Sequence, residues 1–237
     1  AETLPYLVEA EVGVGSVVEL ILGPGPAGDA AFDDGTLTAR IAVGDGVTPA
    51  AAEGPPLADS VSQWSTAGVQ GEAGWWSGFW DRTADLASGD GVYSAADFTP
   101  FPRGPGPWGP TNYWTGSSWD WPSGNPPWTG LGQTGVHPNS ANHGPEHHVI
   151  RRWVSDTEGT LAVWWTVRKT NPNGSGVTAT LYQNGVQRDQ WSVAGPDQEG
   201  VERLVWVAGV AVGDTLDLAL DPRGPNGDPT DGSDGSE

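Results

Sequence analysis

The amino-acid sequence predicts an all-β protein in which a small N-terminal β element precedes an antiparallel β-sandwich. The chain of 237 residues contains 36 glycines and 21 prolines, which are frequent in turns and rare inside helices. Val, Thr, Leu and Trp alternate with polar residues in several short runs, as in strands. No segment stands out as an amphipathic helix, so we expect β structure with many turns.

The first segment of the chain is expected to span residues 1–58. It is poor in aromatic residues, and every tryptophan lies beyond it. This change in composition predicts a boundary near residues 57–60 and a second segment of residues 59–237. Within the first segment, residues 16–22 and 36–43 have the pattern of short strands. Two strands are too few for a stable domain, so the segment needs the following domain or copies of itself.

The second segment contains five stretches with strand character. Residues 160–168 alternate poorly, so we expect a strand that is covered on both faces. Residues 177–183 and 186–193 flank Asn184-Gly185, which is the preferred pair for a type I′ hairpin turn. Two further runs separated by a short turn complete the set, residues 201–207 and 215–220. Antiparallel strands with short turns indicate a two-sheet sandwich.

The formal net charge of −20 restricts the possible partners. Phosphate groups would repel such a chain, so we expect neither nucleic-acid binding nor attraction to an anionic membrane. No apolar run is long enough for membrane insertion, and nothing at Ala1 has the pattern of a secretory leader. Cysteine is absent, which excludes disulfides and thiol chemistry. The acidity is also typical of solvation in a halophilic or marine source.

A tryptophan-rich stretch, residues 101–128, is the most informative feature of the sequence. Its Pro-Gly, Gly-Pro and Ser-Gly steps predict successive turns. Indole rings can stack on the apolar face of a sugar while amide, carboxylate and imidazole groups bind its hydroxyls. The candidate carbohydrate-binding residues are Trp108, Tyr113, Trp114, Trp119, Asp120, Trp121, Trp128, His137 and His143. Alternatively the loop is a lid with its own tryptophan core, although part of the cluster should remain exposed.

Two groups of side chains could hold a metal ion. Four histidines fall between positions 137 and 148, but they lack the helical spacing of zinc hydrolases, so we expect hydrogen-bonding or structural histidines. Near the C-terminal end, Asp221, Asp228 and Asp231 offer closely spaced oxygens that calcium would accept. A disordered acidic tail explains the same composition. No other cofactor is indicated.

An enzyme is not expected. Pairs of carboxylates can hydrolyse glycans, but acidic residues are so frequent in this chain that finding pairs carries almost no information. The sequence has no Gly-x-Ser-x-Gly elbow either. Arg151 and Arg152 lie in a strand-like run, where one is expected to face inward or pair while the other is solvated.

The first segment carries a Gly44-Asp45-Gly46 turn between the strand at residues 36–43 and a Pro-Leu-Ala exit. The glycines permit the positive φ of a tight turn. In this order, residues 35–49 and 54–58 resemble a small N-terminal module of bacteriophage tail and head fibres. The resemblance implies an attachment and trimerisation element that docks on capsid or tail proteins. An ordinary hairpin turn is the alternative interpretation.

The second segment carries an ordered set of motifs: residues 70–76 (QGEAGWW), His137-Pro138, residues 149–153 (VIRRW), Glu158-Gly159, Asn184-Gly185-Val186, residues 212–217 (VGDTLD) and residues 221–224 (DPRG). Spanning most of residues 61–231, this set resembles the jelly-roll β-sandwich module of bacterial polysaccharide-degrading and cell-surface proteins, found also on spikes of phages and gene transfer agents. The resemblance implies an antiparallel jelly-roll sandwich and glycan contact. Such modules continue into a final strand, so the end at Glu237 predicts a sheet edge that is open or covered by another chain.

Together these features predict a head-fibre, tail-fibre or spike component on a virion surface that binds a bacterial surface polysaccharide through an exposed aromatic loop. We expect a homo-oligomer, with a trimer favoured, in which several weak sites act together. Two other classes stay open: a structural decoration protein without glycan binding, and an accessory domain of a polysaccharide-degrading enzyme. Replacing Trp119 and Trp121 with Ala should abolish adsorption to the host without unfolding the protein.

Overall fold

A computed structural model of the chain describes residues 56–230 and 233–237. The strands expected at residues 16–22 and 36–43 lie outside the described residues, as do the turn at 44–46 and Asp231. The boundary near residues 57–60 and the attachment role of residues 1–58 therefore stay predictions.

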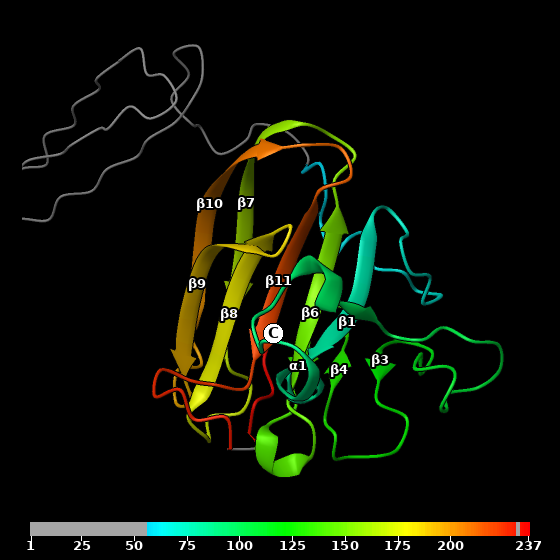
Figure 1. The fold of residues 1–237 in the computed structure, drawn as a ribbon, viewed down its shortest axis with the longest axis vertical. Coiled ribbons are helices and arrows are strands. Elements are labelled where there is room, and N and C mark those ends of the chain that lie inside the picture. The colour runs from blue at the N-terminus through cyan, green and yellow to red at the C-terminus, as the bar shows by residue number, and fades with distance from the viewer. Residues whose placement is uncertain (1–55, 231–232) are drawn as a thin grey trace, which may run out of the picture. The chain divides into compact units, whose positions relative to one another are not determined.

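The described residues are mostly antiparallel β structure (Figure 1), which confirms the all-β fold class. The jelly-roll connectivity stays a prediction. The elements in chain order are β1 (Trp75–Asp81), α1 (Arg82–Ser88), η1 (Ala95–Asp97), β2 (Thr99–Pro100), β3 (Trp119–Asp120), β4 (Gly130–Leu131), β5 (Val136–His137), η2 (Ala141–His143), β6 (His147–Val154), β7 (Gly159–Val167), β8 (Gly176–Gln183), β9 (Val186–Ala194), β10 (Val201–Val210) and β11 (Thr215–Asp221).

A six-stranded sheet with the order β2-β1-β6-β11-β8-β9 forms one layer. The separate pair β7 and β10 packs against one part of it through an apolar core that includes Trp165, Val167, Val177, Leu181, Val207 and Leu220. These residues lie at alternate positions of their strands, as expected where one face of a sheet is buried. The arrangement is that of a sandwich.

The expected hairpin is confirmed by β8 and β9, which pair antiparallel around Asn184-Gly185. Asn184 has φ 50° and Gly185 has φ 80°, so both central residues adopt the left-handed backbone that a type I′ turn requires. The strands expected at residues 201–207 and 215–220 are found as β10 and β11.

The expectation that β7 is covered on both faces is wrong. Trp165 and Val167 are buried against the six-stranded sheet, whereas Trp164 is 47% exposed on the other face. Since β7 pairs only with β10 in a two-stranded sheet, the described residues supply no layer above that face.

The tryptophan-rich stretch covers the remaining part of the same face of the six-stranded sheet. Phe79 of β1 and Val149 of β6 lie opposite each other there, and both pack against residues of the stretch and its neighbours, namely Phe101, Trp114, Trp119 and Leu131. The short strands β3, β4 and β5 form a three-stranded sheet within this region. Thus the loop is folded onto the sandwich as an aromatic layer.

The second layer consists of the β7–β10 pair and the sheet of β3, β4 and β5. Residues 235–237 join these two parts. Ser236 exchanges backbone hydrogen bonds with Val136 at 2.8 and 3.0 Å, and Glu237 does so with Arg168, also at 2.8 and 3.0 Å. The C-terminal residues thus pair with β5 and with the chain just beyond β7, while β2 and β9 remain the edge strands of the six-stranded sheet, and the expectation of an edge that is open or covered by another chain stays a prediction. Asp234 is buried, so this end is not a solvated acidic tail.

Candidate functional site

A groove of about 380 Å³ lies over the three-stranded sheet formed by β3, β4 and β5. Four of the expected carbohydrate-binding residues meet there: Trp119, Asp120, Trp128 and His137. The remaining lining comes from Asn125, Ser118, Leu131, Val136 and Thr170, from glycines 130, 132 and 135, and from Gly235 and Ser236.

Strand register explains how the groove opens. Asp120 pairs with Gly130, and Gly130 pairs with His137, so these residues form one row across the three strands. Directly opposed residues project on the same face of a sheet. The strands that carry Asp120 and His137 are roughly 10 Å apart, which corresponds to two strand spacings. Because Gly130 has no side chain, a narrow strip stays free between them, and Asp120 Oδ1 borders it at 3.5 Å from where a Cβ of Gly130 would lie.

Trp128 forms an aromatic wall of this groove. It is 39% exposed, and its ring lies 5.7 Å from the ring of His137 at an interplanar angle of 30°. The backbone N–H of Trp128 donates to Asn139 Oδ1 at 2.9 Å, which fixes the residue at its base. An exposed indole beside an imidazole tilted by 30° offers an aromatic surface for an apolar ring face.

His137 supplies a neutral acceptor. Its Nδ1–H donates to the carbonyl oxygen of Pro138 at 2.7 Å, so Nε2 carries the lone pair of the neutral ring. Burial lowers the pKa of His137, and the charge of Lys169 acts in the same direction. The ring is therefore neutral at pH 7 and can accept a hydrogen bond from a hydroxyl group.

Asp120 lies on the opposite side of the strip. Burial raises the pKa of its carboxyl group, although a hydrogen bond from the backbone of Trp121 opposes the change. The carbonyl oxygen of Asp120 accepts a hydrogen bond from Trp108 Nε1 at 3.2 Å. Trp108 is 42% exposed, so a second indole is held near Asp120 while its ring stays accessible.

Trp114 and Trp119 do not present open ring faces, contrary to expectation. They are only 6% and 3% exposed. Trp119 stacks on Phe101 at 6.0 Å and meets the edge of Trp114 at 5.1 Å. A stretch with so little regular structure is held in place mainly by side-chain packing, and these two rings supply it. The alternative of a lid with its own core therefore describes this part of the loop.

Tyr113 and Trp121 are partly buried and pack against that core. Trp121 packs edge-on against Phe79 at 5.4 Å and against Tyr113 at 5.2 Å, and it also contacts the ring of His147 at 4.7 Å. Neither residue lines the groove. His143, which ends η2, is held by Ser140 at 3.1 Å and is also absent from the lining.

Of the expected calcium ligands, Asp221 and Asp228 are described, and each is held by its own local hydrogen bonds. Asp221 accepts a hydrogen bond from the backbone of Arg223 at 2.7 Å, and burial raises the pKa of its carboxyl group. Asp228 bonds to Thr230 within its own turn, and Asp231 lies outside the described residues. Within residues 56–230 and 233–237, no group of three or more His, Asp or Glu side chains could hold a metal ion. The calcium site stays a prediction that this geometry does not support.

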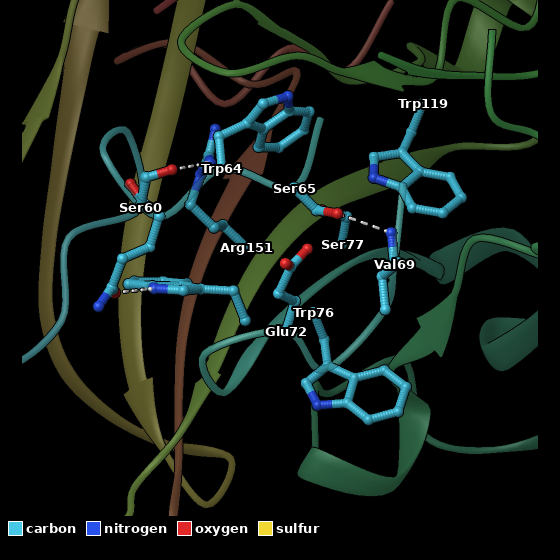
Figure 2. Close-up of a pocket in the computed structure, with 11 residues that line it drawn as sticks. Ser60, Trp64, Ser65, Val69, Glu72, Trp76, Ser77, Trp119 and Arg151 are labelled. Atoms are coloured by element: carbon cyan, nitrogen blue, oxygen red, sulfur yellow. Dashed lines mark hydrogen bonds between the residues drawn. The ribbon is translucent and has the colours of Figure 1, made fainter. Parts of the chain in front are cut away.

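Arg151 braces the floor of the groove. Its guanidinium donates to the carbonyl oxygens of Gly132 and Gln133. It also donates to the carbonyl oxygen of Ser60 and lies over Trp64 at 5.4 Å (Figure 2). Burial lowers its pKa to about 10. The adjoining hollow of about 20 Å³ has room for about one water molecule and not for a sugar. Arg151 thus connects the turn between β4 and β5 to Ser60, which precedes β1 in the chain.

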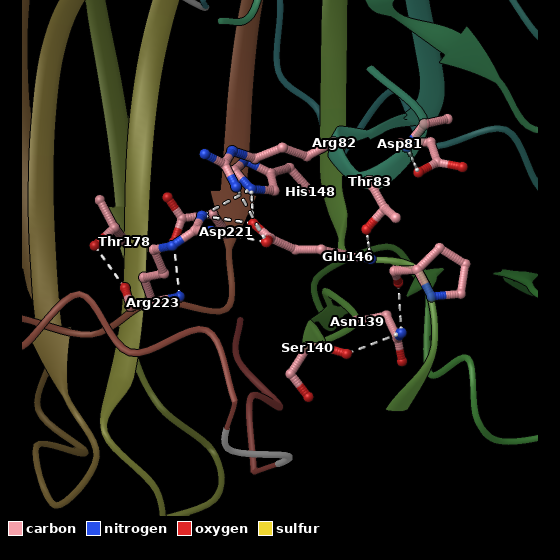
Figure 3. A network of polar contacts seen from close by, with 12 residues as sticks. Asp81, Arg82, Thr83, Asn139, Ser140, Glu146, His148, Thr178, Asp221 and Arg223 are labelled. Carbon is pink, nitrogen blue, oxygen red and sulfur yellow. Dashed lines mark hydrogen bonds and ion pairs between the residues drawn. The ribbon is translucent and has the colours of Figure 1, made fainter. Parts of the chain in front are cut away.

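A second buried network surrounds Glu146 (Figure 3). Its carboxylate binds Arg82, His148 and Arg223 at 3.3, 2.9 and 2.5 Å. Burial raises the pKa of Glu146, but the hydrogen bond from His148 and the charge of Arg223 outweigh it and lower the pKa to about 2. The carboxylate is therefore fully occupied by its partners, as in a structural network. The expected structural use of the histidines agrees with this geometry.

The sequence interpretation overlooked three exposed apolar side chains on the β7–β10 pair. Trp164, Leu204 and Trp206 are 47%, 38% and 44% exposed. The alternation of residues 162, 164 and 166 against 161, 163, 165 and 167 was the available signal for two different faces. This alternation is hard to recognise in the sequence because both faces of β7 carry apolar side chains.

Arg152 is not solvated, although a solvated arginine was expected next to Arg151. It binds the buried Asp217 through Nε at 2.6 Å.

None of the described helices is long and apolar enough to cross a membrane. Comparison with protein-family models, curated proteins and solved structures gives no significant match to the chain.

Proposed function

We propose that this chain is a non-catalytic virion component, part of a head fibre, tail fibre or spike, that binds a bacterial surface polysaccharide in the groove over β3, β4 and β5. The observation that carries the proposal is the row Asp120–Gly130–His137 beside the exposed ring of Trp128. The ring would stack on a sugar face, while Asp120 and the neutral His137 accept hydrogen bonds from hydroxyl groups.

The chemistry of the groove favours a neutral sugar over an anionic one. Asp120 is the only charged side chain among the lining residues, and the chain as a whole carries a net charge of −20. An anionic ligand would be repelled on approach. The resemblance to fibre modules adds the virion context, in which several copies on one particle compensate for weak single sites.

The test is titration of the full chain with neutral oligosaccharides identified on a glycan array. Trp128→Ala should lower the affinity by about tenfold, since that factor is about 1.4 kcal/mol and aromatic contacts contribute about 0.5–1.5 kcal/mol. The matched control is Trp191→Ala on β9, which removes an indole that is 46% exposed outside the groove. It should leave the affinity unchanged.

Equal affinity of Trp128→Ala and the wild type would contradict the proposed site, provided that both unfold at the same urea concentration. Trp119 is unsuitable for this test because it is buried. Trp119→Ala should destabilise the fold by about 3–5 kcal/mol, so that loss of adsorption would report unfolding and not lost sugar contact.

A further inference from the structure

The outer face of the β7–β10 pair is apolar and uncovered among the described residues. Leu204 lies opposite Trp164, and Trp206 lies opposite Ala162, so the two indoles are diagonal neighbours on one face. All three large side chains are between 38% and 47% exposed. The core side of the pair is formed by the neighbouring residues Trp165, Val163 and Val205. The fold therefore does not require indoles on the outer side.

This face continues into the groove along β7. The residues at even positions, Trp164, Thr166, Arg168 and Thr170, are all exposed, whereas Trp165, Val167 and Lys169 between them are buried. Thr170 is also part of the groove lining. Six residues of extended chain span roughly 20 Å, so Trp164 lies about that far along the strand from the groove.

The crossing between the two regions is polar and carries a negative charge, because the exposed Glu202 lies directly opposite Thr166 on this face. Arg168 forms an ion pair with Glu237 there, which pairs the two opposite charges. Thr166 adds a hydroxyl group next to it. The outward side chains from Trp164 to Thr170 thus begin with an apolar ring and continue with three hydrogen-bonding groups, which are the two kinds of contact that a sugar chain makes.

The size of the apolar face argues against a protein partner. With about 250 Å² for a fully exposed Trp, the exposed parts of Trp164, Leu204 and Trp206 amount to roughly 300 Å². A stable protein interface buries about 800 Å² on each partner. The face is therefore too small by itself for a stable dimer, whereas a narrow ligand that lies along a strand needs much less area.

We infer that the groove and the outer face of β7 and β10 form one continuous track for a long, linear polysaccharide with few negative charges. The inference rests on the proposed function and adds the ligand class. Trp128 and His137 hold one part of the sugar chain, and Trp164 and Trp206 hold a part several sugar units away. Short oligosaccharides reach only the groove.

The experiment compares four forms of the full chain: the wild type, Trp128→Ala, the double variant Trp164→Ala with Trp206→Ala, and the control Trp191→Ala. Each is titrated calorimetrically with cello-, chito- and laminari-oligosaccharides from the disaccharide to the octasaccharide. In the series that binds, the wild type should bind the octasaccharide at least tenfold more tightly than the trisaccharide. The double variant should lose this gain and keep the trisaccharide affinity, whereas Trp128→Ala should weaken both.

Four results would overturn the track. If octasaccharides bind no more tightly than trisaccharides, or if the double variant keeps the gain, the inference fails while loss of trisaccharide binding in Trp128→Ala still supports the groove. If no series binds, the proposed function fails together with the track. If sedimentation shows an oligomer that the double variant converts to a monomer, the face is a protein interface. If the double variant unfolds, the single variants Trp164→Ala and Trp206→Ala replace it in the titrations.

Discussion

At the scale of single residues, the same residue type serves different purposes within one loop. Trp119 is 3% exposed and Trp128 is 39% exposed, although they are only nine positions apart in the sequence. The sequence identified both as candidates because indole chemistry is the same in either position. Trp119 lies in β3 and packs into the core, whereas Trp128 precedes β4 and stays accessible, so of these two only Trp128 remains a candidate for sugar stacking.

His147 provides a residue-scale prediction on pH. It is fully buried, its Nε2 has no hydrogen-bond partner, and burial lowers its pKa to about 4, although the nearby charge of Asp81 opposes this. Between pH 6.5 and about 4, His147 is therefore protonated in the unfolded chain and neutral in the folded chain. The free energy of unfolding should be fully maintained above pH 6.5 and should fall by about 3 kcal/mol as the pH approaches 4.

Urea unfolding at pH 7.0 and at pH 4.5 measures this change. The loss of stability between the two values should be smaller in His147→Gln than in the wild type, and His143→Gln should retain the full loss. Glu146 contributes at lower pH, because its stabilisation is lost between about pH 4.5 and 2. An identical loss in His147→Gln and the wild type would exclude His147 as the acid-sensitive group.

At the scale of elements, the strands that carry local signals were predictable. The β8–β9 hairpin follows from Asn184-Gly185, and β10 and β11 follow from apolar runs between turns. The coverage of β7 was not predictable, because it depends on how many strands join its sheet. The short strands β3, β4 and β5 have only two residues each and leave no periodic pattern.

The C-terminal residues support an element-scale prediction. Residues 235–237 form backbone hydrogen bonds with Val136, Arg168 and Thr170, and so join β5 to the chain beyond β7. Removing residues 235–237 should destabilise the protein by about 3 kcal/mol or more, at about 1 kcal/mol for each hydrogen bond. It should also weaken binding in the groove, because Gly235 and Ser236 line it.

The matched control is Glu237→Gln, which removes only the exposed ion pair with Arg168. It should cost less than about 1 kcal/mol. Thermal unfolding and oligosaccharide titration of both variants distinguish the contributions. If the truncated chain is as stable as Glu237→Gln, these residues do not join the two parts of the layer.

At the scale of the whole molecule, the net charge of −20 gives a prediction on salt. Self-repulsion of like charges destabilises the compact state, and salt screens it. Raising NaCl from 0.05 to 0.5 M should therefore stabilise the protein by about 1 kcal/mol, which corresponds to about 2–4 °C in Tm for a chain of this size. Calorimetry in NaCl, with sucrose as an uncharged control, measures it. A Tm that falls with salt would mean that the ion pairs, such as Arg203 with Asp189, outweigh the repulsion.

The candidate site was predictable in residue type and only partly in position. Aromatic, acidic and imidazole side chains near residues 108–137 indicated a sugar site, and Asp120, Trp128 and His137 do meet in one groove. Trp164 and Trp206 were missed because they lie far from that stretch in sequence. They come near it only through the strand register and the course of β7.

The sequence by itself determined the β class, the hairpin turn, the acidity and the choice of aromatic chemistry, because each of these follows from local composition or from neighbouring residues. The tertiary structure alone decided which indoles are exposed and which residues share a groove. Both depend on contacts between segments far apart in the chain, such as Phe79 with Trp121 and Val136 with Ser236. Such contacts are set by packing of the complete fold, which no local pattern records.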